Sequence, residues 1–198
     1  MKLLILDGPR DPRSGKNPRY RGTHRAHPSH CDELPDSDEI NKLFFWFLGE
    51  GGELGAVHDL PKALRFAELW NTHLKEKDRF EVVEVTDGND QPQTEGVFIG
   101  FDLSSGYNNS LLVCGLKYLP GAHQLTESVR ERLDLLNRQY APQINVQGLF
   151  QTSEVASLCL RSMIALQDLS PDLFEGGDLR DFEPVGLHLV SASGIYDR

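Results

Sequence analysis

The chain has 198 residues, of which 39% are hydrophobic and 25% are charged. This length and apolar content predict one folded domain with a sizeable core, and they exclude a wholly disordered chain. Thirty acidic residues against 20 Lys and Arg give a formal net charge of −10, which disfavours a protein that binds nucleic acid or an anionic membrane through its overall charge.

The longest apolar runs, such as residues 43–48, are far shorter than the roughly 18–20 residues that a membrane span needs. The apolar part of the N-terminus is likewise too short for a secretory signal. Three widely spaced cysteines, Cys31, Cys114 and Cys159, do not have the spacing of a metal site. We therefore expect a cytoplasmic protein with reduced thiols and no membrane partner.

The predicted elements begin with a short buried strand over residues 2–7, followed by an irregular segment over residues 8–35. Residues 1–31 hold seven Lys and Arg against two Asp, a net charge of +5, and most of this charge lies between Arg10 and Arg25. We interpret the segment as a solvated basic loop or arm. A phosphate-binding arm is the alternative, although the segment has only one aromatic residue with which to stack on single-stranded nucleic acid.

A run of acidic residues follows the basic segment. Across residues 32–60, eight acidic side chains face one lysine, Lys42. Such a surface suits a basic protein partner, because complementary charge speeds encounter and selects partners. The residues predicted to form it are Asp36, Asp38, Glu39, Glu50, Glu53 and Asp59. Phe45 or Trp46 would supply an aromatic anchor if it were exposed beside them, although both also fit a helix core.

Two helices are predicted within this acidic region. Asp36 and Glu39 have the spacing of a capping box, in which side chains satisfy free amides at the start of a helix. The helix that they open is expected to end at Gly49. A second helix is expected from Asp59 to about Lys77, with a proline in its first turn.

Beyond the second helix the hydrophobic pattern changes to alternation, which is typical of strands. Strands are predicted over residues 79–86, 96–103 and 109–116, joined by short polar turns as in an antiparallel meander. Helices over residues 127–140 and 153–169 and a last strand over residues 185–190 follow. Helices and strands are segregated, so we expect a single α+β domain over residues 1–198, in which the antiparallel meander packs against about four helices.

Three histidines and a cysteine in the basic segment are ligand types that zinc prefers. They are His24, His27, His30 and Cys31. Pro28 interrupts the helix that would align them, neighbouring arginines repel a divalent cation, and no second ligand pair closes a tetrahedral site. We therefore predict no metal site and no cofactor.

The chain contains no linear motif for catalysis. The glycine-rich residues 49–55 lack the Gly-x-Gly-x-x-Gly spacing and a following lysine, so we predict a helix connection there rather than a phosphate loop. Residues 101–110 place Asp102 among hydroxyls and amides, and a triad there would need a histidine such as His123 or His188. We predict no catalytic residue. A hydrolase or transferase without a linear motif is the alternative.

Five segments of the chain together resemble the small cytoplasmic immunity proteins that bacteria use against polymorphic or contact-dependent toxins. These segments are residues 36–49, 52–55, 97–103, 109–112 and 182–190. The resemblance implies a non-enzymatic protein that binds a toxin tightly and covers its active site, and it carries over no individual residue roles. Toxin nucleases are often basic because their substrate is polyanionic, so an acidic partner also fits this role on physical grounds. A nucleic-acid-binding accessory protein that uses the arm between Arg10 and Arg25 is a further alternative.

Overall fold

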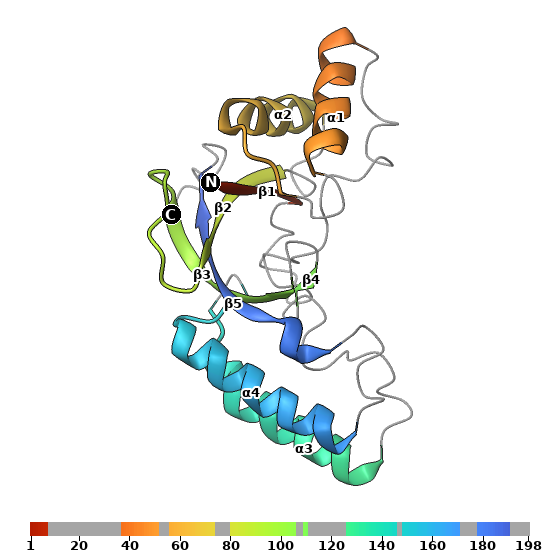
Figure 1. Ribbon diagram of the computed structural model, residues 1–198, viewed down its shortest axis with the longest axis vertical. Coiled ribbons are helices and arrows are strands. Elements are labelled where there is room, and N and C mark those ends of the chain that lie inside the picture. Colours follow the sequence, from red (N-terminus) through yellow and green to blue (C-terminus); the bar gives the residue numbers. More distant parts are fainter. Residues whose placement is uncertain are drawn as a thin grey trace.

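The computed structural model describes residues 1–7, 37–51, 56–73, 80–105, 109–110, 126–145, 148–170 and 178–190. Within them, four α-helices pack against a five-stranded antiparallel sheet, which confirms the predicted α+β class (Figure 1). The predicted basic loop over residues 8–35, with its histidines and Cys31, lies outside the described residues.

The sheet has the strand order β1-β2-β5-β3-β4. Its strands are β1 (Lys2–Asp7), β2 (Phe80–Asp87), β3 (Val97–Ser105), β4 (Asn109–Ser110) and β5 (Glu183–Leu189). Every neighbouring pair is antiparallel, and the register of β3 against β5 shifts between Phe98 and Gly100. β1, β2, β3 and β5 lie close to the predicted strands, whereas residues 111–116 of the strand predicted over 109–116 lie outside the described residues.

The predicted order of the meander is wrong in one respect, because β5 lies between β2 and β3. β2 and β3 both run antiparallel to β5 and are therefore parallel to each other, so residues 88–96 must cross β5 and also return along it from the level of Val185 to that of Leu189. This is a distance of roughly 17 Å, which nine residues span easily. The Gly88 amide donates to the Pro184 carbonyl at 3.2 Å, where the chain passes the start of β5. Polar turn residues indicate where a strand ends, but they do not indicate which strand pairs with it.

The helices are α1 (Asp38–Gly51), α2 (Leu60–His73), α3 (Glu127–Tyr140) and α4 (Ser153–Leu169). The bounds of α3 and α4 are those predicted from the sequence. α1 differs from the prediction, because the Ile40 amide donates to the Ser37 hydroxyl at 3.2 Å, which makes Ser37 the N-cap. α1 also continues past Gly49, where a glycine was expected to end it.

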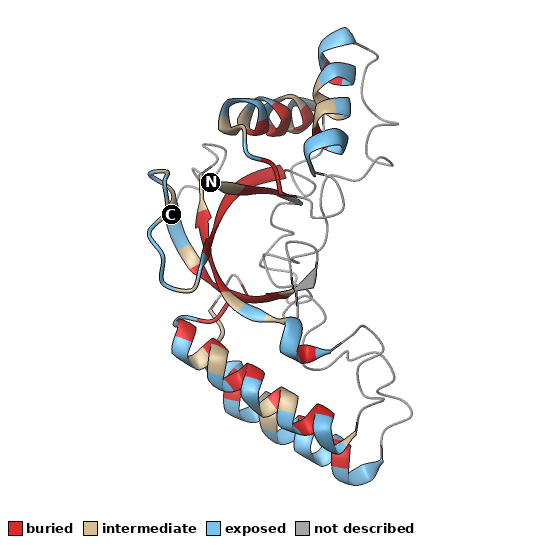
Figure 2. Cartoon of the chain, in the orientation of Figure 1, coloured by how far each residue is buried: buried red, intermediate tan, exposed pale blue. Residues whose placement is uncertain are grey.

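The hydrophobic core has two parts (Figure 2). The first core lies between α1, α2 and the strands β1 and β2, and its central rings, Phe66 and Trp70, are stacked with centroids 3.9 Å apart. The second core joins the sheet to α3 and α4 and includes Leu103, Met163 and Leu187. Figure 1 shows the two helix pairs at opposite ends of a curved sheet. Among the described helices, none has both the length and the apolar character needed to cross a membrane.

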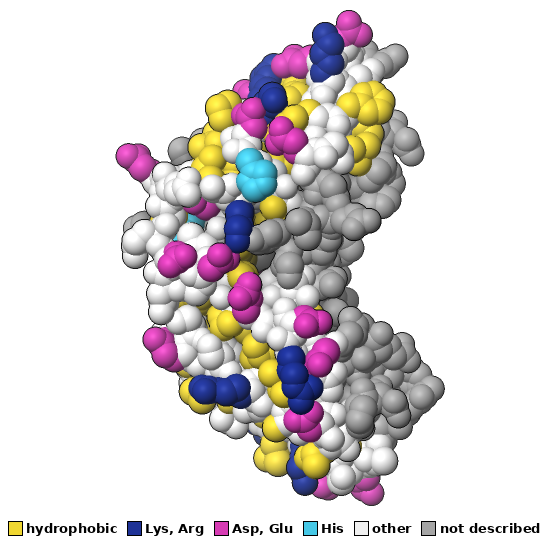
Figure 3. All heavy atoms as spheres, in the orientation of Figure 1, with side chains coloured by type: hydrophobic (Ala, Val, Ile, Leu, Met, Phe, Trp, Pro, Cys, Tyr) yellow, Lys and Arg dark blue, Asp and Glu magenta, His cyan; other side chains and the backbone are white. Residues whose placement is uncertain are grey.

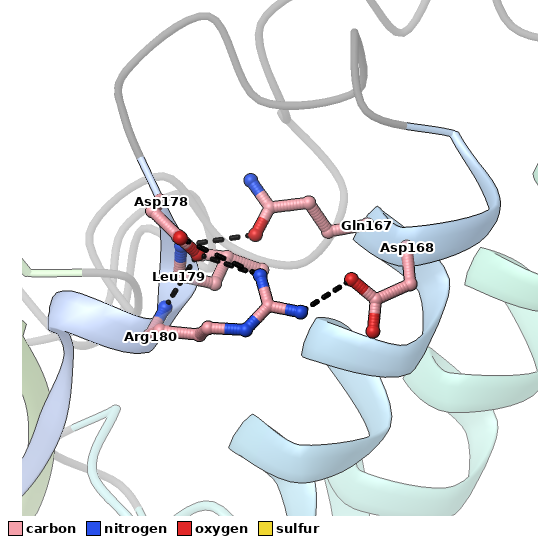
Figure 4. A network of polar contacts seen from close by, with 5 residues as sticks. All are labelled: Gln167, Asp168, Asp178, Leu179 and Arg180. Carbon is pink, nitrogen blue, oxygen red and sulfur yellow. Dashed lines mark hydrogen bonds and ion pairs between the residues drawn. The ribbon is translucent and has the colours of Figure 1, made fainter.

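A polar network fastens the start of β5 to the end of α4 (Figure 4). Gln167 accepts a hydrogen bond from the Leu179 amide at 3.0 Å, in the short 3-10 helix η7 (Leu179–Asp181). Arg180 forms ion pairs with Asp168 and Asp178. Because η7 leads directly into β5, this network fixes the position at which the central strand enters the sheet.

Candidate protein-binding surface

The structure describes four of the six acidic residues predicted to bind a partner. Asp38 and Glu39 lie in the first turn of α1, Glu50 lies near its end, and Asp59 precedes α2. Asp36 and Glu53 lie outside the described residues. α1 packs on α2, so the four acids belong to one helix pair, but the length of α1 separates Asp38 from Glu50 by about 18 Å.

Two of these acids are paired with bases of α2. Arg65 Nε donates to Glu39 Oε1 at 2.8 Å, and Lys62 Nζ lies 3.1 Å from Asp59 Oδ2. The hydrogen bond from Arg65 lowers the pKa of Glu39, and hydrogen bonds from the amide and then the side chain of Lys62 lower the pKa of Asp59. Both carboxylates therefore stay ionised at neutral pH, but a base neutralises each of them.

The charge of the helix pair is consequently more balanced than the sequence run indicates. Its described acids are Asp38, Glu39, Glu50, Asp59 and Glu68, and its described bases are Lys42, Lys62 and Arg65. Acidic and basic side chains lie next to one another over α1 and α2 at the top of Figure 3. The acidic run covers residues 32–60 and therefore does not include the two bases of α2. Its net charge overstates the negative charge of the folded surface.

α1 has two different exposed edges. With about 100° of rotation per residue, Glu39, Trp46 and Glu50 fall on one edge, which faces the bases of α2. On that edge the Lys62 ammonium lies 5.4 Å from the Trp46 ring centroid, a cation–π contact. Trp46 is half-buried and therefore serves the packing of α1 on α2.

The second edge of α1 faces outward and carries apolar side chains. Phe45 is 69% exposed and Leu48 is 43% exposed. Asp38 precedes Phe45 by seven residues, which places the two side chains about 20° apart around the helix axis. Asp38 is exposed, and no ion pair joins it to another residue of the described chain. We define the outer edge of α1 as Asp38, Phe45 and Leu48.

An aromatic anchor of the predicted surface must be exposed beside an acid. Phe45 is such a residue. The sequence could not show which of Phe45 and Trp46 is exposed. Residues 43–48 are all apolar, and a run without polar residues does not indicate which side of the helix faces the core. The discriminating signal lies outside the run, in the exposed residues Asp38 and Asn41 at helical spacings from Phe45.

The residues considered for catalysis do not come together. Asp102 is buried in β3, where its Oδ1 accepts from the Leu103 amide at 2.7 Å. Asp102 pairs with Val185 of β5, so alternation along β5 places it on the opposite face of the sheet from His188. His123 lies outside the described residues. An Asp102–His188 dyad is thereby excluded.

The described residues also hold no metal-binding cluster of three or more His, Cys, Asp or Glu side chains. Cys159 is buried in α4, and burial raises the pKa of its thiol to about 12, so the thiol is neutral and unreactive at physiological pH. Cys114 lies outside the described residues. His58 is exposed, and its Nδ1 lies 2.7 Å from the Met1 carbonyl oxygen.

Comparison of the chain with protein-family models, with curated proteins and with solved structures found no match. The outer edge of α1 carries side-chain types that protein interfaces use. An aromatic ring and a leucine can enter an apolar pocket, and the neighbouring carboxylate can meet a cation at the rim of that pocket.

Proposed function

We propose that this protein is a non-enzymatic protein-binding domain of the cytoplasm, and specifically an immunity protein that neutralises a basic bacterial toxin by covering its active surface. The observation that supports the proposal is the outer edge of α1, where Phe45 is 69% exposed beside Leu48 and beside Asp38, an acid that forms no ion pair within the described residues. Aromatic residues, phenylalanine among them, are enriched at the buried centres of protein interfaces.

Phe45 is expected to supply most of the affinity at this edge. Burying a phenylalanine side chain contributes about 1.5–3 kcal/mol, which corresponds to roughly a tenfold to hundredfold change in affinity. Asp38 lies beside the anchor and remains accessible to solvent, so its charge acts mainly on the association rate. The net charge of −10 attracts a basic partner over a longer range and makes association sensitive to salt.

The first experiment identifies the partner and measures its affinity. The tagged full-length chain captures proteins from a lysate of its source cells at low and moderate salt, and the protein recovered in near-stoichiometric amount is purified. Phe45→Ala is expected to weaken its binding more than tenfold, and Asp38→Lys to slow association several-fold at low salt. Binding that Phe45→Ala leaves unchanged would show that the partner uses another surface.

The α3 helix offers matched controls for both substitutions. Leu135 is 57% exposed and Asp134 is exposed in the same helix. Leu135→Ala and Asp134→Lys remove an apolar side chain and reverse a charge on a surface far from α1, so we expect both to leave affinity unchanged. A loss equal to that of the α1 variants would indicate a general effect of charge or stability.

Neutralisation requires a separate measurement. The partner expressed alone is expected to arrest growth, wild-type chain co-expressed with it is expected to restore growth, and Phe45→Ala is expected to fail at the same expression level. A partner that does not impair growth would contradict the immunity role and leave a protein-binding role in place.

A further inference from the structure

Residues 88–96, which cross β5 between β2 and β3, are fastened at their first end by two contacts. The Gly88 amide donates to the Pro184 carbonyl, and the Ser153 hydroxyl donates to Asn89 Oδ1 at 3.0 Å. Gly88 has a φ of +53°, a conformation that glycine adopts without strain. The first end is therefore joined both to β5 and to the start of α4.

The second end is fastened by a single carboxylate. Glu84 of β2 accepts from the amides of Gln93 and Thr94, each at 2.8 Å, and from the Thr94 hydroxyl at 2.6 Å. Glu84 is 2% exposed. A buried carboxylate is costly unless hydrogen bonds satisfy it, so three donors from one short segment make Glu84 the anchor of that segment.

His188 is the titratable group that faces this anchor. Strand register places His188 of β5 opposite Glu84, and the apolar Leu3 of β1 on the other side. His188 is buried, with its Nε2 3.2 Å from Thr86 Oγ1 and its ring centroid 5.3 Å from that of Phe98. Within the described chain, His188 is the one titratable group whose charge acts on Glu84.

We propose that residues 88–96 form a strap that the ionised carboxylate of Glu84 latches to the sheet, and that neutralising Glu84 releases the strap at this end while the sheet stays folded. A carboxylate can accept all three hydrogen bonds. A protonated carboxyl group turns one oxygen into a donor, which then opposes an amide or hydroxyl that also donates. Release frees the segment that leads to Val97 and Phe98, both of them exposed apolar residues.

The latch opens in acid. Burial raises the pKa of Glu84, but the donors from Thr94 and Gln93 together with His188 outweigh it, so the pKa lies below the ordinary value of 4.5. Burial lowers the pKa of His188 below 6.5, against the opposing effect of Glu84. The Glu84 carboxylate therefore stays ionised, and the strap stays latched, until the pH falls below 4.5.

Amide hydrogen exchange of the full chain, corrected for intrinsic rates, tests this proposal. At pH 7 the amides of Gln93 and Thr94 are expected to be protected. Well below pH 4.5 their protection is expected to fall at least tenfold, while the amides of Val83 and Val85 in the same sheet stay protected. Glu84→Gln is expected to remove protection of the two strap amides already at pH 7. The glutamine side chain has an NH2 group in place of one carboxylate oxygen, and this group cannot accept a hydrogen bond from the strap.

Glu68→Gln is the matched control, since Glu68 is exposed on α2 and pairs with Arg65. It is expected to leave strap protection unchanged. Thr94→Val provides a second test if Glu84→Gln fails to fold, and it is expected to weaken protection of the strap amides selectively at pH 7. The proposal would be overturned if protection of the strap amides did not change with pH, with Glu84→Gln or with Thr94→Val. Loss of Val83 and Val85 protection together with the strap would overturn it too, because the sheet would then have unfolded.

Discussion

At the scale of single residues, Gly100 shows how closely the chain packs beside β3. Its φ is +140°, and a Cβ atom added there would lie 2.6 Å from Leu149 Cβ. Asn145 crosses the same gap, donating from Nδ2 to the Ile99 carbonyl at 2.7 Å and accepting from the Leu149 amide at 3.1 Å. The absent side chain is therefore what allows this segment to lie directly against the strand.

We expect Gly100→Ala to destabilise the protein by about 1–3 kcal/mol, through backbone strain and overpacking. Gly49 is the matched control, because it lies in α1 with nothing within 4 Å of an added Cβ. Gly49→Ala should stabilise the protein by roughly 0.5–1 kcal/mol, since alanine favours the helix. Urea unfolding measures both changes. Equal effects of the two substitutions would contradict the close approach at Gly100.

At the scale of elements, the start of α2 shows why the acidic surface could be predicted only in part. Asp59 was assigned to a partner from its charge, but its Oδ1 accepts from the Lys62 amide at 3.1 Å and caps α2. Glu39 is likewise paired, with Arg65 of the other helix. A sequence run gives the number of charges, whereas the pairing depends on which helices meet.

Substitutions at Asp59 separate its two possible roles. Asp59→Ala removes the cap and is expected to lower the Tm by about 2–4 °C, whereas Asp59→Asn keeps a capping oxygen and is expected to leave the Tm nearly unchanged. If Asp59 acts only as a cap, Asp59→Asn also leaves partner affinity unchanged. A large loss of affinity with an unchanged Tm would show that Asp59 also contacts the partner.

Helix bounds were more predictable than strand order for a related reason. α3 and α4 have local signals at both ends, such as Thr152, whose hydroxyl accepts from the Val155 amide at 3.3 Å. The place of β5 between β2 and β3 depends on contacts between residues about 100 positions apart, such as the pairing of Val85 with Leu187. No local pattern records such a pairing, so the class of the fold followed from the sequence and the order of the strands did not.

At the scale of the whole molecule, β2 joins the two cores. Alternation turns Phe80 and Val82 toward α1 and α2, whereas Val83 and Val85 belong to the second core. If β2 leaves the sheet when one core is lost, the side chains that it contributes to the other core are exposed as well. We therefore expect the two cores to unfold together, although they lie at opposite ends of the sheet (Figure 1).

The two tryptophans make this coupling measurable. Both Trp46 and Trp70 lie in the first core, so their fluorescence reports on α1 and α2, whereas far-UV circular dichroism reports on the whole chain. Met163 is buried in the second core, and Met163→Ala is expected to destabilise the protein by about 2–5 kcal/mol. Because β2 couples the cores, the tryptophan transition in urea should shift with the circular dichroism transition and by the same amount.

Leu135→Ala is the control, because it removes a similar volume from the surface and should shift neither transition. A fluorescence midpoint that stays at the wild-type value while the circular dichroism midpoint falls would show that each helix pair unfolds with its own part of the sheet.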